Sequence, residues 1–274
     1  MNLSLFQIIA LSLVQALTEF LPISSSGHLV VIPQLLGLPT QPLVFDTTLH
    51  LATSLSLLVF FSKDLLDIAF DLIKDLLKHK THIKRFSHNG KMGLYVLIAS
   101  IPAGIVGILF SDFLESTFRQ LYYVSAFLIV GSILMLIAEN VYEKIDAKSD
   151  LSYKKALIIG IFQTLALLPG ISRSGSTISA GMLLGLSREY AAKFSFIMAV
   201  PIITFAAFFE FYDSYSLITF DINLLVGFLV TFVSGLFVIK FLLNFLKSHS
   251  IYVFVIYRVL LAIIVLFVYF VSMI

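Results

Sequence analysis

The sequence predicts an all-α polytopic membrane protein: an inverted-topology repeat with six full transmembrane helices and two re-entrant helical hairpins. Three observations predict this fold class: an apolar composition, apolar stretches of membrane-spanning length, and two similar interruptions. The 274 residues are 59% hydrophobic and only 12% charged, against about 25% charged in soluble proteins. This composition excludes a soluble globular fold. The absence of cysteine excludes disulfides, thiolate metal sites and cysteine nucleophiles.

Six apolar stretches are long enough for a helical crossing, which needs about 20 residues. They span residues 43–61, 92–110, 121–139, 193–209, 222–246 and 251–274. Two further apolar regions, 3–38 and 156–186, are each interrupted in the middle by proline, glycine and hydroxyl residues. We interpret both as hairpins that enter the membrane and return. Irregular backbone at that depth needs protein or water partners, so we expect the two breaks to face one another.

The two breaks are similar in sequence. With a one-residue gap, the matched pairs are Leu21 and Leu168, Pro22 and Pro169, Ile23 and Ile171, Ser24 and Ser172, Ser26 and Ser174, and Gly27 and Gly175. Three full spans follow each break, and an odd number of crossings inverts the second copy. We therefore expect a single membrane domain, 1–274, with repeat 1 at about 1–140, repeat 2 at about 151–274, and a site between the breaks.

The placement of charge predicts the orientation. Of the 18 lysines and arginines, 15 lie in segments that this topology puts on one side, which the positive-inside rule makes cytoplasmic. The loops 111–120 and 210–221 are acidic and contain a single basic residue, Arg119. We expect both loops and both chain termini to be external. The segment 64–77 is amphipathic and should be a solvated or interfacial helix. The N-terminal residues do not resemble a signal peptide, and the net charge of +2 gives no reason to expect nucleic-acid binding.

The second break contains a charge at membrane depth, Arg173. Such a charge costs about 2.5 to 3.5 kcal/mol, so it is rare without a partner or a purpose. The break also has glycines and a guanidinium fork, which together with its hydroxyls suit a phosphate. The hydroxyls are those of Ser172, Ser174, Ser176 and Thr177. Ser176 and Thr177 are candidates to cap the returning helix. The structural alternative is a kinked helix whose arginine pairs with a buried acid.

The first break offers that acid and further polar groups. Glu19 and Gln15 lie one helical turn apart, and they precede three serines and His28. The serines are Ser24, Ser25 and Ser26. Together these residues supply a metal ligand, a candidate nucleophile and a proton carrier; the alternative is a satisfied polar network that joins the hairpins. Asp46 and His50 form a second such pair, with two interpretations: a structural pair, or a pair that reaches the same cavity. We expect Arg258 to pair with a buried acid or to extend to the membrane surface.

The stretch from Gln15 to His28 and the run Pro169-Gly-Ile-Ser-Arg-Ser-Gly-Ser-Thr177 resemble the paired signature of the undecaprenyl-diphosphate phosphatases, the bacitracin-resistance protein family. The resemblance extends along essentially the whole chain. It implies a multi-pass enzyme of the bacterial inner membrane that removes the terminal phosphate of undecaprenyl diphosphate at a periplasm-facing site. The product is the monophosphate carrier for peptidoglycan synthesis. Because bacitracin sequesters the diphosphate, more enzyme implies resistance.

The resemblance also implies site roles. Ser25 is the candidate nucleophile, with His28 or Glu19 accepting its proton, and attack by a metal-activated water stays open. Arg173 is catalytic and binds phosphate, and the other expected phosphate ligands are Ser172, Ser174, Thr177, Ser24, Ser26 and Gln15. A divalent cation, Mg²⁺ or Ca²⁺, is implied, with Glu19 as its ligand. The family pattern Glu-x-x-x-Glu has Gln15 at its first position here, and a neutral amide cannot be a second anionic ligand.

The alternative function is a flippase or transporter of a polyprenyl phosphate lipid, because inverted repeats with broken helices are a transporter architecture. The expected partners are undecaprenyl diphosphate and membrane lipid. The sequence does not determine the oligomeric state, and a homodimer is one of the assemblies that it allows.

Overall fold

Helices form the framework of the part of the chain that the structure describes. The computed structural model describes residues 3–35, 37, 43–118, 120–145, 147, 150–214 and 221–271. Its α-helices are α1 (Leu5–Phe20), α2 (Ser25–Leu35), α3 (Leu43–Phe60), α4 (Ser62–His79), α5 (His88–Phe118), α6 (Leu121–Tyr142), α7 (Tyr153–Thr164), α8 (Arg173–Leu183), α9 (Arg188–Ser214), α10 (Ile222–Phe245) and α11 (Tyr252–Val271). Two short 3-10 helices are η1 (Ile83–Arg85) and η2 (Leu165–Leu167). The predicted all-α class is confirmed.

Five of these helices, α5, α6, α9, α10 and α11, are each long and apolar enough to cross a membrane. The predicted span at 43–61 corresponds to α3, which meets that standard only together with α4, and the two helices are bent by 71° where they join. The described residues thus hold five candidate spans, or six if α3 and α4 form one bent span. The chain is therefore a helical, multi-pass membrane protein.

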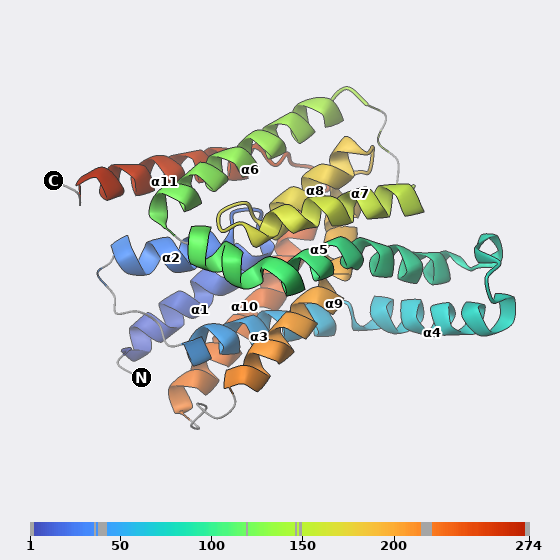
Figure 1. Ribbon diagram of the computed structural model, residues 1–274, viewed down its shortest axis with the longest axis horizontal. Helices are drawn as coiled ribbons and strands as arrows, with labels where there is room; N and C mark the ends of the chain where they lie inside the picture. The colour runs from blue at the N-terminus through green and yellow to red at the C-terminus, as the bar shows by residue number, and fades with distance from the viewer. Residues whose placement is uncertain are drawn as a thin grey trace.

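The breaks in the two interrupted regions have local causes. A capping box starts α1: the Ser4 hydroxyl accepts from the Gln7 N–H, and the Gln7 side chain accepts from the Ser4 N–H. Pro22 then ends α1, because proline lacks an N–H and disfavours helical backbone in the residue before it. From there α2 runs back beside α1 (Figure 1). In the second region, residues 165–172, with η2 and Pro169, separate α7 from α8.

The two chain ends lie on one side of the molecule. In Figure 1, α1 begins and α11 ends at the same end, while α4 and the first turns of α5 project at the opposite end. This layout agrees with the predicted placement of both termini opposite the lysine-rich segment 63–91. Part of the acidic-loop prediction lies outside the described residues: Arg119, residues 215–220, and the side chains of Asp112, Glu115, Glu210 and Asp213.

The broken half-helix α8 lies at the centre of the bundle, packed against α6, α7 and α9. Every residue from Ser174 to Met182 is buried. Ile178 and Met182 join an apolar core that includes Phe196 and Met198 of α9. The other half-helix, α2, packs against α1 and α6. Because α6 contacts both half-helices, it positions the two breaks relative to each other.

The amphipathic segment predicted at 64–77 forms most of α4. On the side facing α5, the Asp75 carboxylate accepts from the Ser87 N–H at 2.7 Å and the Ser87 hydroxyl at 2.8 Å. These hydrogen bonds hold the pKa of the Asp75 carboxyl below its ordinary value. The opposite face of α4 exposes large apolar side chains: Leu66, Phe70, Ile73 and Leu77.

Candidate active site

The two breaks have the same local backbone and hydrogen bonds. Ser24 and Ser172 both have positive φ, 77° and 75°. Each serine hydroxyl accepts at 3.2 Å from the backbone N–H three residues on, that of Gly27 or Gly175. A second serine hydroxyl lies 3.3 Å from each of them. A positive φ costs a non-glycine residue about 1 to 3 kcal/mol, so the same strained turn occurs twice.

The repeated turn gives Ser25 and Arg173 equivalent positions, each the first residue of an 11-residue helix. Both side chains bind the same carboxylate. The Ser25 hydroxyl donates to Glu19 Oε2 at 2.7 Å, and Arg173 Nη2 donates to Glu19 Oε1 at 3.3 Å. Glu19 and Arg173, which are 154 positions apart, thus form an ion pair where the breaks meet. The inference that Glu19 is the acid partner of Arg173 agrees with this geometry.

This cluster is sheltered but accessible. The side chains of Arg173 and Glu19 are 14% and 13% exposed. Two buried polar atoms beside them lack a hydrogen-bond partner among the described residues: Arg173 Nη1, a donor, and Gln15 Oε1, an acceptor. Gln15 Nε2 lies 3.4 Å from Glu19 Oε2. The cluster therefore offers a free donor to an anion and a free acceptor to a donor or cation.

Two helix N-termini add positive potential to the cluster. The helices α2 and α8 both begin at a residue that binds Glu19, so the positive ends of their dipoles lie beside that carboxylate. The first backbone N–H groups of a helix have no partner within the helix. An anionic headgroup entering between the breaks would meet these N–H groups and the arginine together.

The other predicted hydroxyl ligands mainly bind backbone and neighbouring hydroxyls. Ser172, and not Ser176 or Thr177, caps α8, because its left-handed conformation directs its oxygen at the helix start. Ser174 donates to Leu21 O at 3.2 Å, across the two breaks. Thr177 donates to Arg173 O at 2.8 Å and lies 2.6 Å from the buried hydroxyl of Ser195, a residue that the sequence did not single out. Ser26 is exposed, while its partner Ser24 is buried.

His28 lies beside the cluster but bonds elsewhere. Its Nδ1 lies 2.7 Å from Ser24 O, and its Nε2 lies 2.7 Å from the hydroxyl of Tyr257. A carbonyl oxygen only accepts, so Nδ1 carries the proton and, in a neutral ring, Nε2 accepts from the tyrosine. The structure therefore does not place His28 in hydrogen-bond contact with Ser25. Tyr257 is a second polar residue that sequence reasoning missed, because a tyrosine near a helix end is also typical of a membrane interface.

The second acid–histidine pair of the sequence lies on α3. Both Asp46 and His50 are partly buried. His50 lies close enough to Glu19 to interact with its charge. Of this pair, His50 thus lies near the cluster, in agreement with the interpretation that the pair reaches the same site.

The expectation for Arg258 was wrong. Its side chain is fully buried, so it does not reach a membrane surface. In the part of the chain that the structure describes, its hydrogen bonds go to neutral oxygens and not to an acid. Carbonyl acceptors have no sequence signature, so the pattern could not predict them.

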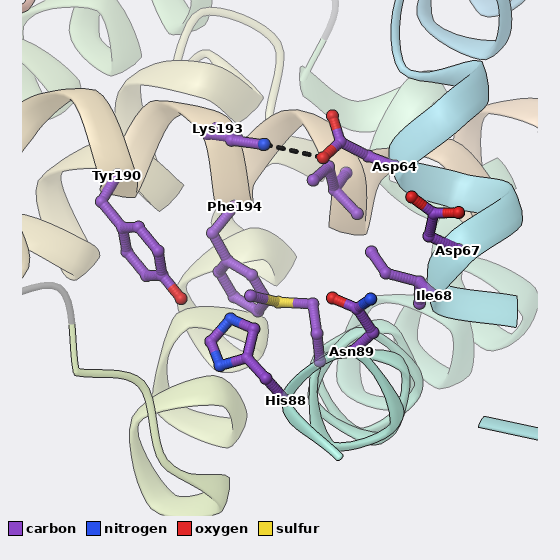
Figure 2. Close-up of a pocket in the computed structure, with 10 residues that line it drawn as sticks. Asp64, Asp67, Ile68, His88, Asn89, Tyr190, Lys193 and Phe194 are labelled. Atoms are coloured by element: carbon purple, nitrogen blue, oxygen red, sulfur yellow. Dashed lines mark hydrogen bonds and ion pairs between the residues drawn. The ribbon is translucent and has the colours of Figure 1, made fainter. Parts of the chain in front are cut away.

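A separate cavity lies between the first turns of α4, α5 and α9 (Figure 2). Its volume is about 180 Å³, and its polar lining includes Asp67, His88 and Tyr190. Lys193 and Asp64 form an ion pair of 2.8 Å at its edge. No residue of the predicted site lines this cavity, so it is distinct from the cluster at Glu19.

Fold and site define a multi-pass helical membrane protein in which a serine, a glutamate and an arginine meet where two helices are broken. The chain belongs to the family described as bacitracin resistance protein BacA, whose model matches residues 8–264. It is similar to the undecaprenyl-diphosphatase of Elusimicrobium minutum, with 42% identity over 261 residues, covering 94% of this chain and 95% of the relative. The undecaprenyl-diphosphatases of Prosthecochloris aestuarii and Methanosphaera stadtmanae are each 39% identical, and each alignment covers at least 96% of both chains.

Proposed function

We propose that the chain hydrolyses undecaprenyl diphosphate to undecaprenyl phosphate and inorganic phosphate. The names of its relatives support the substrate and the reaction. The observation that carries the proposal is the joint binding of Ser25 and Arg173 to Glu19. A hydroxyl bonded to a carboxylate, with a guanidinium beside it, provides the nucleophile, base and charge stabilisation that phosphoryl transfer needs.

The first step is attack by Ser25. Its Oγ bonds to the terminal phosphorus while the anhydride P–O bond breaks, and undecaprenyl phosphate leaves with the bonding electrons. The Ser25 proton passes to Glu19 Oε2, the atom that already accepts its hydrogen bond at 2.7 Å. Water then attacks the phosphorus of the phosphoserine while the Oγ–P bond breaks. The water protons leave on the inorganic phosphate, as dihydrogen phosphate, and the proton on Glu19 returns to the Ser25 oxygen.

Arg173 stabilises the transferred phosphoryl group. Its Nη2 is bonded to Glu19, while its buried Nη1 has no partner among the described residues. That N–H is therefore available to a phosphoryl oxygen, and the adjacent N-terminus of α8 adds partial positive charge. Because the Glu19 bond fixes the guanidinium in advance, little reorganisation is needed when charge develops.

His28 supports the nucleophile through the backbone. Its bond to Ser24 O holds the residue before Ser25 in its left-handed conformation. Glu19 is thus better placed than His28 to accept the serine proton. Direct attack by water, with Glu19 as base, is the alternative, and it predicts that Ser25→Ala retains activity.

The donor atoms fit a divalent cation. The carboxylate of Glu19 and the unpartnered amide oxygen Gln15 Oε1 are hard oxygen ligands of the kind that Mg²⁺ and Ca²⁺ bind. The described residues contain no group of three or more acidic, histidine or cysteine side chains that could hold a metal, so substrate oxygens would complete the shell. When bound, the cation would neutralise diphosphate charge.

The membrane arrangement is part of the proposal. The matched turns at Ser24 and Ser172 support two inverted repeats, about 1–140 and about 151–274, with two re-entrant hairpins and six spans. The basic segment 63–91 would face the cytoplasm, and the cluster at Glu19 would be reached from the periplasmic side of the bacterial inner membrane. Hydrolysis there would recycle the peptidoglycan carrier, and more enzyme would raise bacitracin resistance.

The rival function is transport of a polyprenyl phosphate lipid, for which broken helices at the membrane midplane are also typical. The bond from Ser25 to Glu19 favours the phosphatase, because carriage of a lipid needs no activated nucleophile.

The decisive experiment is phosphate release by the purified protein in detergent, where no second compartment exists. With undecaprenyl diphosphate and Mg²⁺, we expect turnover that falls with a chelator and with Arg173→Ala. Binding of the lipid without phosphate release would support the transporter instead.

A further inference from the structure

Arg258 of α11 is a fully buried cation whose hydrogen bonds join three parts of the chain. Its Nη1 donates to Pro22 O at 3.3 Å, in the first break. Its Nη2 donates to Gly170 O at 2.9 Å, in the second break, and to Leu128 O of α6 at 3.1 Å. Its Nε donates to Ser132 Oγ, also on α6, at 3.1 Å. One side chain thus binds both breaks and the helix between them.

The acceptors explain why an arginine is present. Carbonyl groups in a broken helix lack the helical partner that would otherwise satisfy them, and within a membrane each unsatisfied group is costly. A guanidinium has donors spread over a rigid plane, so it can reach separated oxygens at once, whereas a lysine has three donors on one nitrogen. Among the described residues, Arg258 forms no ion pair.

The surrounding helices leave room for this plane. A Cβ added at Gly131 of α6 would collide with the guanidinium of Arg258 and would lie 2.7 Å from Ile171 O. Glycine at this position lets α6 approach the second break and the arginine closely.

We infer that Arg258 is a positioning residue for the proposed phosphatase, and this inference rests on that proposed function. Arg258 fixes the two breaks so that Ser25 and Glu19 of the first break meet Arg173 of the second. Pro22 is three residues from both Glu19 and Ser25, and Gly170 is three residues from Arg173. Arg258 holds these carbonyls on a single rigid group. It binds neither Glu19 nor Ser25, so it acts through the backbone.

The test compares Arg258→Met with Arg188→Met by hydrogen–deuterium exchange and by phosphate release. Arg188 is a matched control, because it is also a largely buried arginine that binds α6, through Glu139. Within the described residues it forms no hydrogen bond or ion pair with either break. We expect Arg258→Met to accelerate exchange at least tenfold in both breaks, at the amides of Ile23 and Ile171, and to lower kcat/KM about 100-fold, as expected for a shift of about 1 Å. Arg188→Met should leave exchange in the breaks within threefold of wild type.

Unchanged exchange in either break of Arg258→Met would overturn the inference, as would equal acceleration by both variants. If Arg258→Met does not fold, Ser132→Ala removes the Nε acceptor, together with the bond from the Ser132 hydroxyl to Leu128 O within α6, and leaves the acceptors in both breaks in place. This variant should give a smaller acceleration in the same two segments, and no acceleration there would also overturn the inference. Arg258→Lys, which keeps the charge, should not restore kcat/KM. A wild-type protein that releases no phosphate would refute the proposed function, while the exchange data would still test the role of Arg258.

Discussion

Replacing Glu19 with glutamine tests the proposed base while keeping the shape of the side chain. Glu19 accepts from Ser25 at 2.7 Å and from Arg173 at 3.3 Å. The amide cannot take the serine proton, and loss of a general base costs about 10²- to 10⁴-fold in rate. That range equals about 2.7 to 5.4 kcal/mol at 1.36 kcal/mol per tenfold.

The effect should fall on kcat. Because Glu19 is also the proposed cation ligand, the comparison is made at saturating Mg²⁺. Under that condition Glu19→Gln frees Arg173 from its carboxylate partner, so binding of the diphosphate should not weaken, and KM should stay equal or decrease. The assay is the initial rate of phosphate release against substrate concentration for the purified variant in detergent. Glu189→Gln is the matched control, because Glu189 pairs with Lys247 at 3.6 Å on the surface, where both side chains are about half exposed. A Glu19→Gln enzyme with kcat within tenfold of wild type would refute the role of Glu19 as base.

Three further predictions follow from the same structure. Arg173→Ala should lower kcat/KM by at least about 10³-fold, whereas Ser176→Ala, which loses only a bond to Arg173 O, should cost less than about tenfold; comparable losses in the phosphate-release assay would contradict the assigned roles. Gln15→Glu places a second carboxylate beside Glu19, so half-maximal activity should need about tenfold less Mg²⁺; an unchanged Mg²⁺ titration would count against Gln15 as a ligand. Asp75 has a lowered pKa because Ser87 donates to its carboxylate. The ionised carboxylate therefore stabilises the folded protein above the unfolded pKa of about 3.9, and this stabilisation is lost as the pH falls through the lower folded pKa. Asp75→Asn should therefore reduce the dependence of Tm on pH below about pH 4, and equal slopes for variant and wild type would show that the bond contributes nothing.

The sequence predicted the central contact of the site because its signals were distinctive. Arg173 and Glu19 are charges in apolar surroundings, and each occurs at or beside one copy of a repeated Ser-x-Ser-Gly pattern. Charges in such surroundings need partners, so the prediction that they meet followed from electrostatics. The repeat predicted that the two turns would be alike, and Ser24 and Ser172 share their strained conformation.

Other features could not be predicted, for identifiable reasons. Arg258 binds main-chain carbonyls, and every residue has one, so its partners have no sequence pattern. The contact of His28 with Tyr257 joins positions 229 residues apart and depends on how α2 packs. Capping of α8 by Ser172 depends on a positive φ that serine seldom adopts, which is why Ser176 and Thr177 were the more obvious candidates. The bend between α3 and α4 occurs at Phe61, without proline or glycine to mark it.

The most direct test of the account is to look for the phosphorylated nucleophile. Purified protein is mixed with undecaprenyl diphosphate, quenched with acid within the first turnover, digested and analysed by mass spectrometry. We expect phosphate on Ser25 in the wild type, with no phosphopeptide and no phosphate release in Ser25→Ala. Full phosphate release by Ser25→Ala would show that the hydroxyl bonded to Glu19 is not the group that attacks the phosphorus.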